Sequence, residues 1–281
     1  MDQIRILPRR IGWLFKMVSS GEFEILAVDF SMRVYRALFF IVFHLKLAMG
    51  SQPKCRSLVT LKTEFPVAFE SPDHLVPWGT ANDNSSNKKF VLFMDDLVSR
   101  QVGARDKRFL DLGCSGGQLV KDFLDMGWTA VGLEGSDFSQ KHQRANWPLL
   151  GGKNLFTCDL TKPFDLRLDG KPAQFQIITA WEVLEHIPQN DLESLFRTIS
   201  RLLAPDGYFI ASTTAAPDIH DGIDLHQTKM TNAQWRDWVQ RNVKELQHVE
   251  LGLKYYQFVR FNYRERSFIT CRKLAERTQP E

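Results

Sequence analysis

The hydrophobic pattern between residues 107 and 213 alternates between two periods. Five short apolar runs predict buried strands, at 107–112, 129–134, 154–158, 174–180 and 207–213. Apolar residues at helical spacing predict helices between them, at 116–126, 136–147 and 190–202. This alternation predicts an α/β fold with a mainly parallel sheet that is covered by helices on both faces.

The flanking segments extend this pattern. Helical spacing predicts further helices at 88–100 and 231–242, and the turn formers of residues 70–87 predict a loop. Pro205-Asp206-Gly207 predicts a turn before the fifth strand. Three apolar segments follow near the end of the chain, at 246–251, 256–261 and 267–272, and two of them are expected to be the last strands.

Residues 1–50 form a basic, apolar extension that we expect to contain two helices separated near Ser19-Ser20-Gly21. Val34, Leu38, Ile41, Leu45 and Ala48 recur at helical spacing. The uninterrupted apolar run at 37–43 is too short to span a bilayer, which needs about 20 apolar residues. The order of charged and apolar residues is not typical of a signal peptide either.

Two interpretations of this extension compete. Its apolar faces pack on the rest of the chain or on a second copy in a homodimer, because exposed apolar helices are costly. Alternatively, the extension makes a peripheral contact with an anionic membrane. The first 60 residues hold nine Lys or Arg against four Asp or Glu. The side chains expected to insert are aromatic: Trp13, Phe15, Phe39, Phe40 and Phe43.

Composition adds bounds on the class of protein. The four cysteines show no metal-binding or redox spacing, which predicts reduced thiols in the cytoplasm and neither disulfides nor a zinc site. The formal net charge of +3 is small for 281 residues, and no basic run is interleaved with aromatics. We therefore expect no nucleic-acid partner.

The segment Asp111-Leu112-Gly113-Cys114-Ser115-Gly116-Gly117 lies between the first predicted strand and helix of the core. Its glycines allow a sharp backbone turn and close approach of a ligand. Glu134 ends the next strand, 21 residues after Gly113, where a carboxylate can accept hydrogen bonds from ribose hydroxyls. This layout predicts binding of an adenosine-containing cofactor.

A dinucleotide fingerprint would need glycines at positions 113, 115 and 118, and the chain has Gly113, Ser115 and Gln118. This spacing opposes a nicotinamide-dependent oxidoreductase. The run instead resembles the first motif of class I S-adenosylmethionine-dependent methyltransferases, usually Asp-Leu-Gly-Cys-Gly-Thr-Gly, with Ser115 replacing the middle glycine. Residues 182–186, Glu-Val-Leu-Glu-His, are similar to a signature of ubiquinone-biosynthesis O-methyltransferases.

The resemblance implies a Rossmann-like fold with a seven-stranded sheet that includes one antiparallel strand. It implies that S-adenosylmethionine is held by a set of ten residues: Asp111, Gly113, Cys114, Ser115, Gly116, Gly117, Glu134, Asp159, Leu160 and Trp181. In the family, the residue at the position of Asp159 accepts from the adenine amino group. We expect residues 1–50 to be the extension, 51–104 a lid or linker with the first helix, and 105–281 the methyltransferase domain.

The implied chemistry is transfer of a methyl group to a small-molecule, lipid-linked or saccharide acceptor, with oxygen the favoured acceptor atom. A base near the acceptor would remove a hydroxyl proton. Our candidate catalytic residues are His226 and Glu182, with His220 as a second candidate base. A purely structural role for His226 is to anchor its loop through a backbone hydrogen bond. The alternatives to O-methylation are N- or C-methylation, or a degenerate domain that binds without turnover.

Two groups of residues have the chemical types of metal ligands. Asp218, His220, Asp221, Asp224 and His226 match no named spacing. In ubiquinone-biosynthesis O-methyltransferases a Glu-x-x-Glu-His run similar to Glu182, Glu185 and His186 has been associated with a divalent cation. The same run is widespread in methyltransferases without metal, where it orders the loop and the start of the helix, and we predict no metal.

The segment before the first core helix has two interpretations in such a fold. It lies over the cofactor as a lid, or it is a surface connection without ligand contact. The residues that would distinguish the two interpretations are His74, Trp78 and Asn84.

Overall fold

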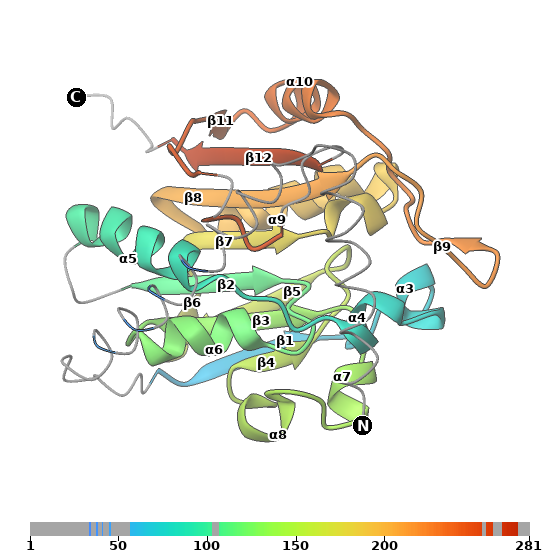
Figure 1. The fold of residues 1–281 in the computed structure, drawn as a ribbon, viewed down its shortest axis with the longest axis horizontal. Helices are drawn as coiled ribbons and strands as arrows, with labels where there is room; N and C mark the ends of the chain where they lie inside the picture. The colour runs from blue at the N-terminus through green and yellow to red at the C-terminus, as the bar shows by residue number, and fades with distance from the viewer. Residues whose placement is uncertain are drawn as a thin grey trace. The chain divides into compact units, whose positions relative to one another are not determined.

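The computed structural model describes residues 57–102, 107–254, 257–260 and 266–274, together with four isolated positions near the N-terminus. Contacts along the chain divide it into two units, Met1–Ser51 and Gln52–Glu281. The second unit contains the predicted core, and Figure 1 shows its strands and helices.

The second unit is built around a seven-stranded sheet. Its strand order is β11 (Leu246–His248), β12 (Arg266–Lys273), β8 (Leu203–Thr214), β7 (Phe175–Trp181), β2 (Arg108–Leu112), β3 (Thr129–Glu134) and β4 (Leu155–Thr157). Neighbouring strands are parallel except at β12, which is antiparallel to both β8 and β11. The predicted mainly parallel sheet with one antiparallel strand is confirmed.

Alternate residues of the strands face opposite sides of this sheet, as the two-residue period of a strand requires. On one side, Phe109 of β2 stacks on Phe123 of α6 (Gln118–Asp125), with ring centroids 3.8 Å apart. Phe90 of α5 (Lys88–Val102) contacts the same ring edge-on at 6.3 Å. On the other side, the Leu110 side chain joins the buried cluster that includes α9 (Leu192–Leu202) and α10 (Asn232–Asn242).

Several predicted elements differ in detail. The helix expected at 136–147 is two short helices, α7 (Phe138–Lys141) and α8 (Trp147–Leu150), because Gln143 and Ala145 between them have positive φ. The turn expected at 205–207 is an irregularity inside β8, where the register with β7 shifts and Asp206 has φ +61°. The loop expected at 70–87 contains α3 (Pro72–Leu75) and α4 (Trp78–Asn82).

Two small sheets were not predicted. β1 (Val59–Thr63) pairs antiparallel with β5 (Phe164–Leu168), which pairs with β6 (Lys171–Pro172). Their buried side chains join the main core because Val59, Leu166 and Leu168 belong to the same cluster as the sheet. β9 (Ile219–His220) and β10 (Ile223–Asp224) form a hairpin after β8. The remaining short helices are η1 (Leu184–His186) and η2 (Gln189–Asp191).

In the first unit, the structure describes Val34, Leu38, Ile41 and Leu45, which are helical as predicted and 45–55% exposed. The other predictions for residues 1–50, including the aromatic side chains, fall outside the described positions. None of the described helices combines the length and the apolar character needed to cross a membrane.

Candidate active site

A cavity of about 780 Å³ opens at the carboxyl ends of the central strands. Gly113 follows β2, Glu134 ends β3 and Trp181 ends β7, and all three line the cavity. The opposite wall consists of residues 68–83 and of the loop after β8. In Figure 1 the arrowheads of β2 and β7 point to the side on which α3, α4 and β9 lie. Parallel α/β sheets bind ligands at this edge, so the cavity has the expected place.

The glycine turn gives the cavity one backbone wall. Gly113 has φ +70°, and its N–H donates to the Leu133 carbonyl at 2.8 Å. A Cβ at Gly113 would lie 2.4 Å from Cγ2 of Val183, too close for any side chain. Gly117, with φ +77°, is the N-cap of α6. The turn therefore needs glycine at these two positions, as the sequence predicted.

Ser115, the departure from the usual glycine, has φ +46° and connects three parts of the site. Its N–H donates to Glu134 Oε2 at 2.6 Å, and its hydroxyl donates to the Asp83 carbonyl at 2.8 Å. Its carbonyl accepts from the indole N–H of Trp147 at 2.7 Å. The serine thus ties the turn to the segment in front of it, which the sequence did not predict.

Glu134 lies on the cavity wall and is only 7% exposed. The Ser136 N–H donates to its Oε1 at 3.3 Å, in addition to the bond from Ser115. Burial raises the pKa of Glu134 to about 7, although these N–H donors favour the charged form. A further donor at this carboxylate, such as a ribose hydroxyl, would stabilise its ionised state.

Asp111 is buried behind the turn and does not line the cavity. Its Oδ1 accepts from the Thr179 hydroxyl at 2.6 Å. Burial raises the pKa of Asp111 to about 7, and the nearby Glu134 charge adds to this effect. Cys114, Gly116 and Gly117 also lie off the cavity wall. These four predicted cofactor residues shape the turn from behind, and a direct contact with the cofactor stays a prediction for them.

The remaining predicted residues lie on the wall. Asp159, Leu160 and Trp181 line the cavity. The Asp159 carboxylate accepts from the N–H and the hydroxyl of Thr161, at 2.9 and 2.7 Å, so it is held in one orientation. The Trp181 ring contacts Phe90 edge-on at 5.2 Å, and its indole N–H has no hydrogen-bond partner among the described residues.

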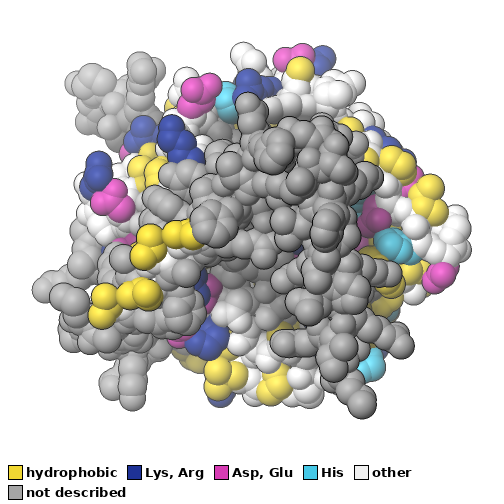
Figure 2. Space-filling view, viewed as in Figure 1, with side chains coloured by type: hydrophobic (Ala, Val, Ile, Leu, Met, Phe, Trp, Pro, Cys, Tyr) yellow, Lys and Arg dark blue, Asp and Glu magenta, His cyan; other side chains and the backbone are white. Residues whose placement is uncertain are grey.

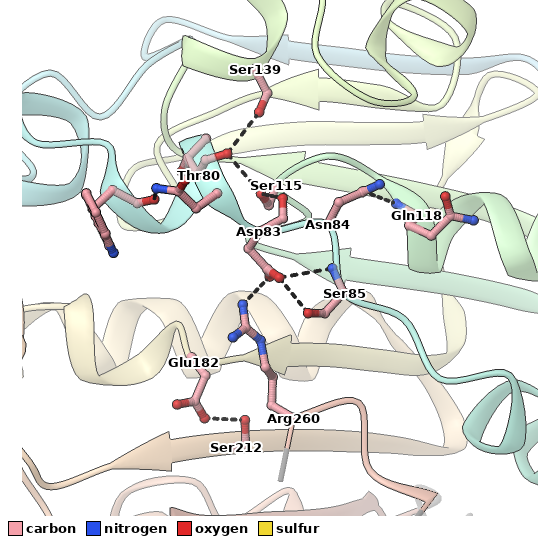
Figure 3. A network of polar contacts seen from close by, with 12 residues as sticks. Thr80, Asp83, Asn84, Ser85, Ser115, Gln118, Ser139, Glu182, Ser212 and Arg260 are labelled. Atoms are coloured by element: carbon pink, nitrogen blue, oxygen red, sulfur yellow. Dashed lines mark hydrogen bonds and ion pairs between the residues drawn. The ribbon is translucent and has the colours of Figure 1, made fainter. Parts of the chain in front are cut away.

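The segment before α5, residues 70–87, which we call the lid, contacts the glycine turn, and its position over a bound cofactor stays a prediction. The Arg144 guanidinium donates to the carbonyls of Thr80 and Asp83, each at 2.6 Å. The Asp83 carboxylate pairs with Arg260, and Asn84 Oδ1 accepts from the first N–H of α6 at 3.0 Å (Figure 3). His74 and Trp78 line the cavity, whereas Asn84 caps α6 and does not line it.

Several members of this network, including Arg144 and Arg260, could not be predicted as site residues from the sequence. Arg144 lies in a stretch that reads as an ordinary helix surface, and Arg260 follows no recognisable motif. Asn84 belongs to a residue type that favours helix N-caps, but the helix that it caps begins 34 residues later. No local spacing connects the two.

The candidate catalytic residues follow β7 and β8, and both line the cavity. Glu182 has φ +56°, and its Oε1 accepts from the Ser212 hydroxyl at 2.6 Å. His226 Nδ1 lies 2.5 Å from the Ala216 carbonyl, which is the loop-anchoring bond expected of a structural role. A carbonyl only accepts, so Nδ1 carries the proton and Nε2 keeps a lone pair. Burial lowers the pKa of His226, which favours this neutral form.

His186 faces the lid. Its Nδ1 lies 2.8 Å from Oδ2 of Asp73, which belongs to α3. Burial acts to lower its pKa, but the neighbouring Asp73 and Glu185 carboxylates raise the pKa of His186 to about 9. Glu185 is fully buried, and burial raises its pKa to about 8. Two groups that can carry charge therefore lie close together, His186 on the cavity wall and Glu185 buried.

The metal-ligand types predicted in the loop after β8 do not come together. His220 pairs with Asp218 at 2.8 Å, and Asp224 pairs with Lys229. Among the described residues, a group with metal-ligand proximity is Glu185, His186 and His226, whose candidate ligand atoms lie within 4.8 Å of one another.

Comparison with known proteins identifies the family. Residues 88–258, more than half of the chain, match the family described as a methyltransferase domain. The chain belongs to this methyltransferase family. A ubiquinone biosynthesis O-methyltransferase of Pseudomonas fluorescens is 31% identical over 120 residues, which are 41% of this chain and 48% of that protein. The Yersinia enterocolitica protein of the same name is 29% identical over 122 residues, 43% of this chain and 48% of that protein.

This methyltransferase-family chain therefore spans about half the length of the curated relatives that it matches. Among solved structures, the magnesium protoporphyrin IX methyltransferase of Synechocystis PCC 6803 with bound SAH is 13% identical, with a TM-score of 0.46. That comparison covers 73% of this chain and 96% of the other.

Proposed function

We propose that this protein transfers the methyl group of S-adenosylmethionine to a hydroxyl oxygen of a small acceptor. The observation that carries the proposal is Glu134, a buried carboxylate on the cavity wall directly beside the glycine turn. The methyltransferase family match supports the same donor. When bound, the donor supplies an electrophilic methyl group, and the protein supplies alignment and exclusion of water.

The donor would be held by groups that the structure already orients. Glu134 would accept from the ribose hydroxyls, and Asp159 from the adenine amino group. Gly113 lines the cavity and has no side chain, so the donor can approach its backbone closely. Asp111 would act indirectly, by holding the end of β2 through Thr179.

The acceptor would lie near His226. Its Nε2 lone pair can take the proton of a hydroxyl that approaches from the cavity, and Ala216 fixes the ring orientation. Glu182 also lines the cavity and would orient the acceptor, because the Ser212 hydroxyl holds its carboxylate in place. An oxygen acceptor needs such a base more than a neutral amine does, which supports O-methylation over N-methylation.

The mouth of the cavity supports an acceptor with an apolar part. Trp78 lines the cavity and is 56% exposed, and Leu75 and Ile219, which adjoin the lining residues His74 and His220 in the chain, are 65% and 62% exposed. Trp78 stacks on His220 across the mouth, with ring centroids 4.7 Å apart. Figure 2 shows hydrophobic and histidine side chains together on this side of the molecule. The curated relatives are named for ubiquinone biosynthesis, which agrees with a partly apolar acceptor.

A turnover assay tests the proposal. The full chain is incubated with S-adenosylmethionine and a panel of phenols, alkylated phenols, sugars and amines, and S-adenosylhomocysteine release is measured with mass spectrometry of the products. We expect release that depends on a hydroxylated acceptor and is lost in Glu134→Ala. Turnover with amines alone would show that the acceptor atom is nitrogen and not oxygen. Donor binding without turnover on any acceptor would favour a binding module.

A further inference from the structure

Two strained residues flank one arginine in the connection between α7 and α8. Gln143 has φ +48° and Ala145 has φ +50°, on either side of Arg144. Residues with a Cβ rarely adopt this left-handed conformation, because it costs free energy. Such strain persists only where the surrounding structure holds it, and it occurs often at functional sites. The strain at these two positions therefore points to a role for the segment.

Residues 143–147, which we call the clamp, hold the glycine turn by two hydrogen bonds. The Asn146 N–H donates to the Gly116 carbonyl at 3.0 Å, and the Trp147 indole N–H donates to the Ser115 carbonyl at 2.7 Å. Trp147 is almost fully buried, so its bond to the turn is shielded from water. The clamp lies off the cavity wall, so it supports the turn from behind.

The clamp holds the lid as well, through Arg144. Nη1 of Arg144 donates to the Thr80 carbonyl and Nη2 donates to the Asp83 carbonyl, each at 2.6 Å. Two bonds from one planar guanidinium fix both the position and the orientation of the backbone that accepts them. The Ser139 hydroxyl also donates to the Thr80 carbonyl, at 3.4 Å (Figure 3). Residues 80–83 of the lid are thus held through their backbone.

The lid, the turn and the clamp meet at Gly116. A Cβ at Gly116 would lie 2.4 Å from Asn84 Oδ1 of the lid and 2.8 Å from the Ala145 Cβ of the clamp. Both distances are too short for a side chain, so the three segments are in close contact around this glycine. The strained backbone of the clamp thus brings Ala145 to the turn while Arg144 reaches the lid.

We propose that Arg144 is a positioning residue for the methyl donor, and that the clamp holds the lid and the turn in the arrangement that binds it. This inference rests on the proposed function. The lid carries the effect to the cavity, because Gly79, Thr80 and Asp83 line it. The Thr80 hydroxyl donates to Oε1 of Glu134, the carboxylate proposed to bind ribose, at 3.5 Å. Arg144 lies off the cavity wall and acts through these residues.

A residue of this kind affects donor binding more than the chemical step. Without the Arg144 bonds the lid would populate other positions, and donor affinity would fall with the fraction of molecules in the binding arrangement. A bound donor restores that arrangement, so kcat at saturating donor is retained. His226 keeps its bond to the Ala216 carbonyl, which does not involve the clamp, so the KM for the acceptor is retained too.

Donor titration of the full chain tests this proposal. Arg144→Ala should weaken binding of S-adenosylmethionine and S-adenosylhomocysteine by about tenfold, measured by calorimetry, while kcat stays within about twofold of the wild type. Arg144→Lys keeps the charge but not the planar fork, so it should recover only part of the affinity. Hydrogen exchange read by mass spectrometry should be faster at residues 79–85 in Arg144→Ala than in the wild type.

Two variants serve as matched controls. Lys141→Ala removes an ion pair with Asp137 on the same short helix, three residues before the arginine. Arg167→Ala removes an arginine that donates to the Asp165 carboxylate and to the Gly170 carbonyl, in the small sheet. Both should change donor affinity by less than about twofold. Urea unfolding checks that each variant is folded.

The outcomes separate this proposal from the proposed function. The proposal is wrong if folded Arg144→Ala keeps wild-type donor affinity, or if affinity falls while hydrogen exchange at residues 79–85 is unchanged. If Arg144→Ala does not fold, Arg144→Lys is judged by the same two measurements. A wild-type chain that binds neither donor nor S-adenosylhomocysteine contradicts the proposed function and, with it, the positioning role.

Discussion

The donor side and the acceptor side of the cavity are built in different ways. The donor side consists of the contiguous turn 111–117 and Glu134, joined mainly by backbone hydrogen bonds such as that from the Ser115 N–H. The acceptor side brings together Asp73 of the lid, His186 of η1 and His226 of a distant loop, joined through side chains. A site built mainly from backbone groups depends on local conformation. A site built from side chains of distant segments depends on how those segments pack together.

The electrostatics of the two sides differ as well. Glu134 and Asp111 on the donor side are both carboxylates whose pKa is raised by burial. On the acceptor side, Asp73 and His186 have opposite charges and stabilise each other. Because burial opposes ionisation of both donor-side carboxylates, an approaching positive group such as a sulfonium would favour their charged forms.

The largest expected effect is on kcat, in a variant of His226, and it should leave donor binding unchanged. Replacing His226 by Ala should lower kcat by about 10²-fold or more, because the proposed base is lost. The affinity for S-adenosylmethionine should stay within about twofold, since His226 lies on the acceptor side. Steady-state kinetics and calorimetric titration measure the two quantities. The control His220→Ala should have a smaller effect on kcat. A large loss of donor affinity in His226→Ala would show that His226 also takes part in donor binding, contrary to this division of the cavity.

The next largest effect concerns the donor side. Glu134→Ala should weaken S-adenosylmethionine binding by about 2 kcal/mol, or about 30-fold, because two hydrogen bonds to a charged acceptor are lost. Calorimetric titration measures the change. Glu134→Gln, which keeps one oxygen acceptor and the side-chain volume, should lose less. Unchanged affinity in Glu134→Ala would refute the assignment of the ribose site.

Donor affinity should also depend on pH. Burial raises the pKa of free Glu134 to about 7, and the Asp73 charge adds to this effect. Ribose donors stabilise the carboxylate, so donor binding releases a proton below pH 7. Affinity should therefore rise about fivefold from pH 6 to pH 7 and about tenfold from pH 6 to pH 8, and then level off. S-adenosylhomocysteine titrations across this range measure it, with Glu134→Gln as the control that should lack the rise.

The smallest effect tests how the lid is tied to the turn. Ser115→Ala loses the bond to the Asp83 carbonyl while keeping a positive φ, and should lower the free energy of unfolding by about 1 kcal/mol. Ser115→Gly loses the same bond but removes the backbone strain, so it should be nearly neutral. Urea unfolding compares the two. Equal destabilisation by both substitutions would mean that the φ of Ser115 carries no strain.

Features that depend on residues close together in the sequence were predicted, whereas features that depend on distant segments were missed. The strands of the main sheet and the glycine turn could be predicted because each depends on short-range periodicity or on a few residues with special φ. The prediction of one helix at 136–147 was wrong in part, because Gln143 and Ala145 adopt positive φ. Neither residue type favours this conformation, so the sequence gives no sign of it. The three-stranded sheet was missed because β1 pairs with a strand about 100 residues away.

The sequence by itself determined the alternating sheet, the position of the cavity at the carboxyl ends of its strands, and a methyltransferase-like turn followed by Glu134. Only the tertiary structure decided that Ser115 binds the lid, that Arg144 and Arg260 hold it, and that His226 lies beside Glu185 and His186. The reason is physical: a turn is specified by the φ and ψ preferences of adjacent residues. A cluster of side chains from three segments exists only once packing has brought those segments together.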